Sequence, residues 1–340
     1  MTAAEGADPR PHRPPHRQPP SQPQLSVPLA SFAAEDPGSW QFLLERARAA
    51  DRAGVDRLVV SDHVVYGENL EAYARPELGG AAGGKQPTGP DGHWLEPLTV
   101  LSVVAGLTSR VRLGTNILLA ALRRPVVLAK SLATLDVLSG GRVDLGVGVG
   151  WQREEYEAAG LPFEGRGKLL DHTLAVLQTI WRERRASFSD DLLAFEAIHS
   201  MPKPRQEGGV PIWVSGTANP RVARRIARFG AGWIPWGPAA ADVRTGIARM
   251  RELVAAAGGT FDGLQVVGTA RAVRAGDGSL DLAATMAPVP ELVEAGVTDV
   301  RIALPVPDDA AAAHDVYAAA VDAFRTATAT VAAGNATSGP

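Results

Sequence analysis

The chain has 340 residues, of which 45% are hydrophobic and 21% charged, a composition typical of a globular protein with a large core. The net charge of −3 supplies no basic field for nucleic acid, and the Cys count of 0 excludes disulfides, iron–sulfur clusters and cysteine nucleophiles. No run approaches the roughly 18 apolar residues of a membrane helix, so we expect a cytoplasmic protein without membrane or nucleic-acid partners.

Residues 1–24 differ in composition from the rest of the chain. They contain seven Pro and lack large apolar side chains, and no hydrophobic segment of a signal peptide follows. Such a segment cannot bury a core, so we expect residues 1–24 to be a disordered tail. Residues 25–335 are expected to form a single domain.

Strand-like and helix-like segments alternate from residue 25 onward. The strand candidates are continuous apolar runs, which are typical of parallel strands buried on both faces. In chain order they are residues 25–30, 57–61, 111–119, 143–149, 211–215, 232–235, 264–270 and 299–304. The helical patterns between them are the segment from Ser39, a predicted N-cap, to Gly54, residues 95–108, the leucine-striped segment from Pro125 to Gly140, and residues 152–159, 168–185, 219–229, 239–257, 287–295 and 309–332.

Two segments interrupt this alternation. Residues 66–93 are rich in Gly and Pro and predict a long loop, a kind of segment that is usually either a functional lid or disordered. A polar segment with Phe188 and Phe195 predicts a hairpin.

Eight strands in alternation with helices predict an α/β fold, a (β/α)8 TIM barrel with insertions. A doubly wound open sheet is the alternative. In a barrel the chemistry gathers at the C-terminal strand ends, where the sequence places Asp62-His63, Thr115-Asn116, Gly148-Val149-Gly150-Trp151, Ser215-Gly216-Thr217 and Ile234-Pro235-Trp236. These residues include no cluster with metal-ligand spacing, so we expect no metal site. Small residues and backbone donors suit a large flat ligand better.

The glycine run Gly146-x-Gly148-x-Gly150 has two interpretations. It departs in spacing and position from a dinucleotide fingerprint. Glycine in a barrel strand makes space for something that presses against it, either a core side chain or a cofactor ring. Trp151 directly after the run favours the ring.

Two further strand ends carry candidate chemistry. Ser215, Gly216 and Thr217 precede a helix that starts at Asn219, where backbone N–H groups can bind phosphate, although an ordinary N-cap is the alternative. His63 after Asp62 is a candidate proton donor or acceptor, and a solvated or structural His is the alternative. Glu154 and Glu155 begin a helix, where favourable placement in the helix dipole explains them.

Taken together, these motifs resemble the luciferase-like flavin or deazaflavin oxidoreductases over residues 25–330, and most closely the branch of probable F420-dependent oxidoreductases. The resemblance rests on several runs: Val60-Ser61-Asp62-His63, Val111-Arg112-Leu113-Gly114-Thr115-Asn116, Arg124-Pro125 through Gly141-Arg142, Leu145-Gly146-Val147-Gly148-Val149-Gly150-Trp151 with Glu154-Glu155-Tyr156, and Pro211-Ile212-Trp213-Val214-Ser215-Gly216.

The resemblance implies a TIM barrel of the bacterial-luciferase type with the cofactor at its C-terminal mouth. Asp62 would contact the cofactor, and a bulge at Thr115-Asn116, often with a non-proline cis peptide, would back its ring. Gly148, Gly150 and Trp151 would flank the ring, and Ser215, Gly216 and Thr217 would hold the phosphate. Trp151 stands where the sugar-phosphate dehydrogenase branch has a catalytic Glu, so a sugar phosphate is not the expected substrate.

The resulting hypothesis is an oxidoreductase that transfers a hydride between coenzyme F420 and a small organic substrate, with His63 as the catalytic proton donor or acceptor. An FMN-dependent monooxygenase that uses O2 is the first alternative, and a non-catalytic deazaflavin-binding protein is the second. The sequence leaves open whether the chain forms a homodimer.

Overall fold

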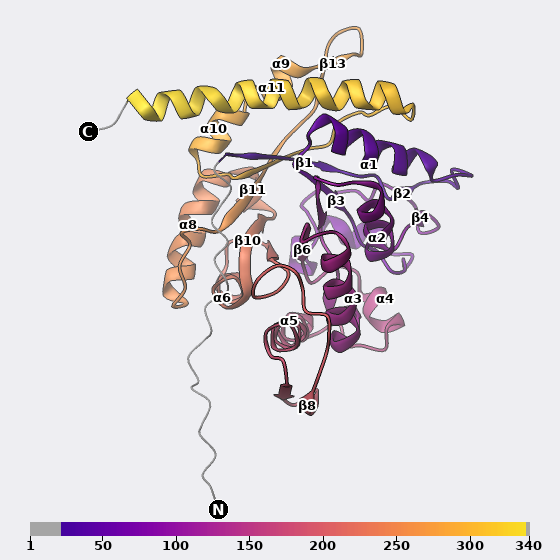
Figure 1. Cartoon of the computed structure of the whole chain (residues 1–340), viewed down its shortest axis with the longest axis vertical. Coiled ribbons are helices and arrows are strands. Elements are labelled where there is room, and N and C mark those ends of the chain that lie inside the picture. The colour runs from indigo at the N-terminus through magenta and orange to yellow at the C-terminus, as the bar shows by residue number, and fades with distance from the viewer. Residues whose placement is uncertain (1–21, 338–340) are drawn as a thin grey trace, which may run out of the picture.

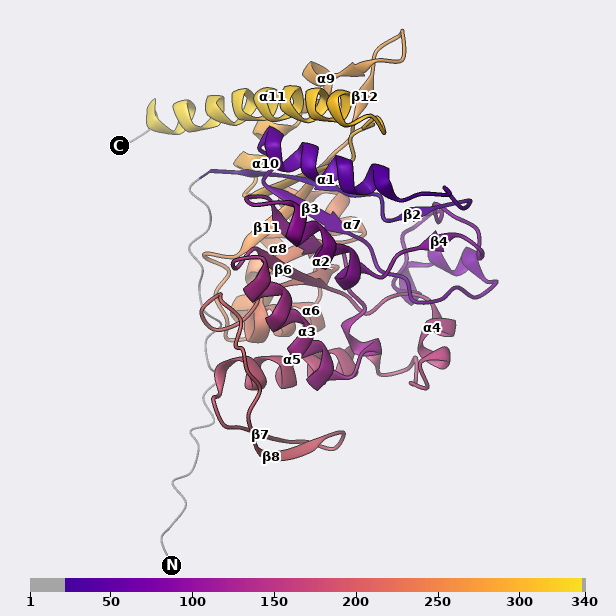
Figure 2. The same ribbon diagram turned by 45° about the vertical axis from the view of Figure 1, so that its right-hand side comes forward.

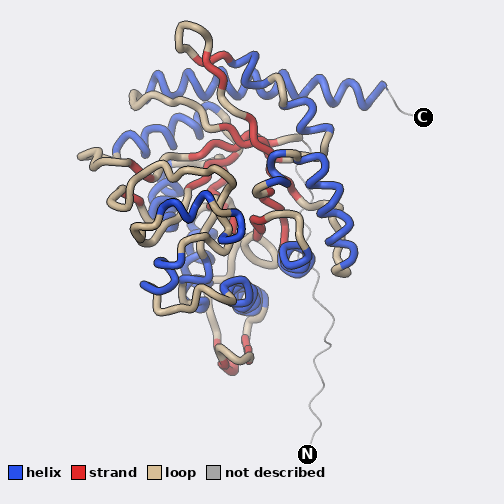
Figure 3. The backbone as a smooth tube through the Cα atoms, turned by 180° about the vertical axis from the view of Figure 1, so that it is seen from behind, coloured by secondary structure: helices blue, strands red, loops and turns tan. Residues whose placement is uncertain are grey.

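The computed structural model describes residues 22–337, which are built around a closed barrel of parallel strands. Figure 3 shows these strands at the centre with helices around them. Around the barrel the order is β1 (Gln24–Pro28), β14 (Asp299–Ile302), β11 (Gln265–Ala270), β10 (Gly230–Pro235), β9 (Ile212–Gly216), β6 (Val143–Val147), β5 (Arg112–Thr115) and β3 (Arg57–Val60), and β3 closes onto β1. The fold is therefore a TIM barrel, and the alternative of an open sheet is wrong.

Helices cover the outside of the barrel (Figure 1). They are α1 (Gln41–Ala53), α2 (Pro97–Leu107), α3 (Pro125–Leu138), α4 (Arg153–Ala158), α5 (Arg166–Arg182), α6 (Pro220–Phe229), α7 (Pro238–Ala241), α8 (Val243–Ala256), α9 (Leu282–Met286), α10 (Val289–Glu294) and α11 (Ala310–Thr337). The long helix α11 lies beside α1 in Figures 1 and 2. Packing of the last helix against the first closes the helical layer around the barrel.

Three antiparallel hairpins or strand pairs lie outside the barrel. They are β2 (Phe32–Ala33) with β4 (His93–Trp94), β7 (Ala186–Ser189) with β8 (Ala194–Ile198), and β12 (Val273–Arg274) with β13 (Leu280–Asp281). The pair β7–β8 confirms the predicted hairpin, and Phe188 lies opposite Phe195 in its register.

The helices follow the apolar spacing of the sequence, with two differences. Helix α1 begins at Gln41, so the predicted cap Ser39 lies outside it, although the Ser39 hydroxyl accepts the Gln41 N–H at 3.2 Å. Gly54 ends α1 in the left-handed region with a φ of 90°. In α3 the expected apolar stripe stops early, because Leu138 is 74% exposed.

Each expected barrel strand is present, and one ends well before its expected end. Strand β5 ends at Thr115 instead of residue 119, and the peptide bond between Asn116 and Ile117 directly after it is cis. The loop of residues 66–93 contains the short helices η1 (Leu70–Ala74) and η2 (Pro76–Leu78) and the start of β4.

Most of the Pro-rich tail, residues 1–21, lies outside the described residues, and Gln24, placed in that tail by the sequence, begins β1. Within the part of the chain that the structure describes, no helix has the length and apolarity needed to cross a membrane.

A buried ion-pair network fills the N-terminal floor of the barrel. Arg57 donates from Nε to Asp144 at 2.9 Å and from Nη1 to Asp299, and Arg112 binds both oxygens of Asp144 at 2.6 and 2.7 Å. The Ser26 hydroxyl donates to Asp299 at 2.6 Å. Side chains from β1, β3, β5, β6 and β14 are thereby joined inside the barrel.

Asp144 is the centre of this network, and its pKa depends on two opposing effects, burial and the nearby guanidinium groups. Burial alone would raise the pKa of Asp144, but the charges and hydrogen bonds of Arg112 and Arg57 lower it from 3.8 to about 2. A carboxyl with a lowered pKa stabilises the fold above its ordinary pKa. That stabilisation is lost as the pH falls from about 4 towards 2.

We predict that Asp144→Asn lowers the free energy of unfolding by about 3–5 kcal/mol, because two buried guanidinium groups lose their shared counter-charge. Denaturation with urea at neutral pH measures the change. Asp262→Asn is the matched control, because Asp262 is 84% exposed and pairs with Arg251 at the surface. An unchanged stability of Asp144→Asn would show that the network is not needed for the fold.

Candidate functional site

The C-terminal mouth of the barrel is open to solvent at its inward-facing positions. Side chains alternate across a strand, so residues two or four positions apart point the same way. The lower barrel holds the inward side chains of Ser26, Arg57, Arg112, Trp213 and Val267, and the residues two or four positions after them point into the mouth. They are Pro28, Ser61, Asn116, Ser215 and Thr269, all of them exposed or half-buried. Their outward-facing neighbours Leu29, Val60, Thr115, Val214 and Ala270 are all buried. The mouth is therefore lined by small or polar side chains with space above them.

The end of β5 supplies one wall of this mouth. The cis peptide bond joins Asn116 to Ile117, which confirms the feature that the resemblance implies at this bulge. The Asn116 carbonyl accepts the Ser61 hydroxyl at 3.3 Å, and its side-chain oxygen accepts Arg301 Nη1 at 2.6 Å. Ile117 packs against the buried side chains of Trp213 and Ile234.

The glycine run of β6 lies against this same segment. A Cβ on Gly146 would lie 2.0 Å from the carbonyl oxygen of Thr115. A Cβ on Gly148 would lie 2.7 Å from Ile117 Cδ1, and one on Gly150 would lie 2.8 Å from Leu119 Cδ2. The alternate glycines thus make room for alternate residues of the segment after β5. In the described structure, residues of the protein itself fill the space beside the glycines. This agrees with the interpretation that the glycine run makes room for core packing.

Asp62 is fully engaged by protein donors. Its carboxylate accepts the Leu119 N–H at 2.8 Å and binds Arg123 through both oxygens, at 2.6 and 3.0 Å. Burial would lower the pKa of Arg123, but its bonds to Asp62 and Glu96 raise it above the usual range. A cofactor contact of Asp62 would share these oxygens with Arg123.

Ser215, Gly216 and Thr217 lie at the mouth and are all half-buried. The side chain of Asn219 caps helix α6 by accepting the N–H groups of Arg221 and Val222 at 2.9 and 3.1 Å. It also donates to the Thr217 hydroxyl at 2.8 Å. The N-cap interpretation is thus present in the structure, and it leaves fewer free N–H groups for a phosphate than the sequence predicts.

His63 lies in an aromatic enclosure at the rim. Its ring centroid is 4.3 Å from that of Tyr66, 4.8 Å from that of Trp94 and 6.0 Å from that of Trp151. Nδ1 lies 3.2 Å from an oxygen of Glu155, and the His63 side chain is 11% exposed. The structure therefore places His63 in a confined contact with an acid, which the sequence did not predict.

The 66–93 loop extends from the end of β3 across the ends of β6 and β10. Tyr73 makes ring contacts with Trp151 and Trp236, at centroid distances of 5.4 and 6.4 Å. The Trp236 indole donates to the carbonyl of Gly80 at 2.8 Å. In Figure 2 the loop, β4 and α4 lie on the same side of the barrel. These contacts give the loop the position of a lid over part of the mouth.

Arg301 is a buried cation below the mouth. It faces inward from β14, and its guanidinium reaches Asn116, Ser26 Oγ at 3.3 Å and Asp299 at 3.9 Å. Burial and the nearby charge of Arg57 lower the pKa of Arg301 to about 9. Asp299 is already bonded to Arg57 and Ser26, so the positive charge of Arg301 is only partly compensated.

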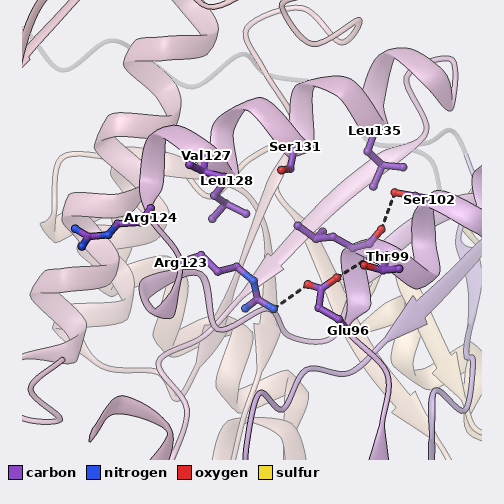
Figure 4. Close-up of a pocket in the computed structure, with 10 residues that line it drawn as sticks. Glu96, Thr99, Ser102, Arg123, Arg124, Val127, Leu128, Ser131 and Leu135 are labelled. Atoms are coloured by element: carbon purple, nitrogen blue, oxygen red, sulfur yellow. Dashed lines mark hydrogen bonds and ion pairs between the residues drawn. The ribbon is translucent and has the colours of Figure 1, made fainter. Parts of the chain in front are cut away.

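A separate groove lies outside the barrel between α2 and α3 (Figure 4). Arg124, Val127 and Ser131 line one side of it, and Arg123 reaches Glu96 within it at 3.0 Å. Arg123 is bound to two carboxylates, those of Asp62 and Glu96, and Arg124 lines this outer groove.

Two residues of the site were missed by the sequence reasoning. Glu155 was explained by the helix dipole, although it is buried to 1% exposure and contacts His63. Arg301 was not singled out, although it lies two residues after Asp299 in a buried strand. A charged residue at an inward position of such a strand is the signal that identifies it. Among the described residues, no group of three or more His, Asp or Glu is placed to hold a metal.

The family model of luciferase-like monooxygenases matches residues 19–284, more than half of the chain. The chain therefore belongs to the luciferase-like monooxygenase family.

Two curated relatives show the range of sequence similarity. An uncharacterized protein of Mycobacterium tuberculosis is 32% identical over 275 residues, which cover 78% of this chain and 89% of the relative. An F420-dependent glucose-6-phosphate dehydrogenase of Amycolatopsis mediterranei is 30% identical over 196 residues, covering 56% of this chain and 52% of the relative.

Solved structures with the same fold include both deazaflavin and flavin enzymes. An F420-dependent secondary alcohol dehydrogenase in complex with an F420-acetone adduct has a TM-score of 0.69 at 17% identity, over 89% of this chain and 99% of its own. The FMN complex of the oxygenating constituent of 3,6-diketocamphane monooxygenase from Pseudomonas putida has a TM-score of 0.63 at 15% identity, over 89% and 98%. At these identities the structures show the fold alone.

We predict unequal losses of stability for two glycine variants, one within β6 and one directly after it. Gly146→Ala would press a methyl group onto the Thr115 backbone, and we expect a loss of more than about 2 kcal/mol of stability. Gly148→Ala meets only the end of the Ile117 side chain, which can rotate, and we expect a loss below about 1 kcal/mol. Chemical denaturation of both variants checks the prediction. Equal losses would contradict the close approach of backbone to backbone at Gly146.

Proposed function

We propose that this chain is an oxidoreductase that binds coenzyme F420 in the barrel mouth and transfers a hydride between it and a small organic substrate. The observation that carries the proposal is the combination, at one mouth, of small inward side chains, an Asn116 carboxamide fixed by Arg301 and an enclosed His63. The F420-dependent relative at 30% identity supports the same cofactor.

The residues present fit a flat, electron-accepting ring. Ser61, Asn116 and Ser215 leave the mouth open where such a ring would lie, and Ile117 offers an apolar surface beside them. The partly compensated charge of Arg301 below Asn116 favours a group that becomes more negative when it is reduced. When bound, F420 supplies hydride acceptance and donation.

The chain's own residues would do three things in this reaction. The carboxamide of Asn116, fixed by Arg301, would orient the ring. Tyr73 and Trp151, together with the 66–93 loop, would exclude water from the reacting groups. His63 would hold or release the proton that accompanies the hydride, because it is the imidazole at this rim.

A second candidate is an FMN-dependent monooxygenase that activates O2. It is favoured by the family's named activity and by the FMN-bound enzyme with the same fold. Flavin reacts with O2 in a way that the deazaflavin does not, so cofactor preference and oxygen consumption separate the two candidates.

We predict that F420 binds at least about tenfold more tightly than FMN, a difference of about 1.4 kcal/mol. Side-by-side titrations that follow cofactor fluorescence measure both affinities, and an oxygen electrode records uptake with each reduced cofactor. We expect no oxygen uptake with F420. Tighter binding of FMN with oxygen uptake would replace the first candidate by the second.

We predict that His63→Ala keeps the F420 dissociation constant within a few-fold and lowers turnover about a hundredfold, the lower end for lost general acid–base catalysis. Oxidation of reduced F420 by a quinone acceptor gives the rate, and the melting temperature gives the folded fraction. Unchanged turnover per folded molecule would remove His63 from the catalytic residues. Binding of F420 without any turnover in the wild-type protein, over a panel of acceptors, would support the non-catalytic binding protein.

A further inference from the structure

Glu155 carries an unusual combination of contacts for a buried acid. It lies in α4 and is 1% exposed. Its Oε1 accepts the backbone N–H of Val64 at 2.8 Å and lies 3.2 Å from His63 Nδ1. Its Oε2 is buried and has no hydrogen-bond partner in the part of the chain that the structure describes. A buried carboxylate with one free oxygen is costly unless a charge or a dipole nearby compensates it.

The environment makes the contact with His63 strong. Tyr66, Trp94 and Trp151 surround the imidazole, and so little water screens the Glu155–His63 interaction. The same carboxylate contributes, after burial, to raising the pKa of the Tyr66 hydroxyl. Tyr66 therefore stays a neutral phenol, and the imidazole is the group beside Glu155 that can take up a proton.

The geometry decides which ring nitrogen carries the proton. Neutral imidazole has one N–H donor and one bare acceptor nitrogen. With the proton on Nδ1, the ring donates to Glu155 Oε1. With the proton on Nε2, the lone pair of Nδ1 would face a carboxylate oxygen at 3.2 Å, which is repulsive. A proton on Glu155 Oε2 would find no acceptor there.

We propose that Glu155 is a positioning residue that holds His63 in the Nδ1–H tautomer and stabilises the ring when it is protonated, so that Nε2 is the proton-transfer atom of the site. The catalytic use of this dyad rests on the proposed function, whereas the tautomer does not. An aspartate plays the same part for the histidine of serine hydrolases.

The proton balance of the reaction shows why the dyad matters. In the oxidation of a substrate alcohol, the C–H bond would break and its electron pair would leave as hydride, for which bound F420 would supply the acceptor. The O–H bond would break, its electron pair would form the second C–O bond, and the proton would move to His63 Nε2. The imidazole ring would then carry a positive charge that Glu155 stabilises. In the reduction of a carbonyl the same proton returns from Nε2.

Glu154 is a matched control for Glu155. Both residues lie in the first turn of α4, so the change to Gln alters the helix by the same charge. The side chain of Glu154 lies beside Gly67 and is only half-buried. Glu155→Gln keeps the size of the side chain and an oxygen for the Val64 N–H, and removes the charge that faces His63.

The test is the tautomer of His63 in the protein without added ligand. Histidine labelled with 15N gives ring-nitrogen NMR signals that distinguish Nδ1–H from Nε2–H at alkaline pH, where imidazole is neutral. The chain has 7 His, and loss of signals in His63→Gln assigns the one of interest. We expect mainly Nδ1–H in the wild type and in Glu154→Gln. We expect a mixture or mainly Nε2–H in Glu155→Leu, which removes the oxygen that faces Nδ1.

An Nε2–H tautomer in the wild-type protein would overturn the proposal, and this result does not depend on whether any Glu155 variant folds. An unchanged tautomer in folded Glu155→Leu would overturn it as well. The second measurement is turnover with F420 and a quinone acceptor, for which we expect about a tenfold loss in Glu155→Gln at unchanged F420 affinity and no loss in Glu154→Gln. Failure to bind F420 would refute the proposed function and leave the tautomer result standing.

Discussion

The buried ion pairs at the floor of the barrel are the interaction on which the rest of the structure depends. Asp144 and Asp299 together neutralise Arg57 and Arg112. With Ser26, these side chains join five of the strands from the inside. Such a network is expensive to desolvate, and it is stable only because each group finds several partners. Its arginine and aspartate side chains fill the lower barrel, so only the upper layer has space for a ligand.

The wall of the upper layer beside β5 is shaped by glycines. The glycines at the end of β6 let Thr115 and Ile117 approach so closely that these two residues occupy the space that side chains would take elsewhere. Between them, Asn116 binds Arg301, and that bond connects the mouth to the charged floor.

Much of the fold could be predicted from the sequence, because apolar runs in alternation with helical patterns leave few architectures open. The eight barrel strands were located by this signal. The early end of β5 could not be predicted from the apolar pattern, since residues 117–119 are apolar although the strand ends at Thr115. The glycine run was recognised as a close approach, but only coordinates show that Ile117 and Leu119 fill it.

The sequence predicts where the site lies in the barrel, but not which side chains contact one another within it. Strand ends located His63, Asn116 and Ser215 at the mouth, because the barrel fixes where those ends lie. The partner of His63 could not be found in this way, because an acid at a helix start already has a sufficient explanation in the dipole. Only the burial of Glu155 and its unpartnered oxygen distinguish it from Glu154.

A crystal structure of the protein soaked with F420 tests the central claim most directly. The account predicts the deazaflavin ring in the barrel mouth, against the Asn116–Ile117 peptide, with His63 Nε2 facing the side of the ring where a substrate would lie. A ring bound in the outer groove between α2 and α3, or a mouth closed by the 66–93 loop with no ring in it at saturating F420, would contradict the account.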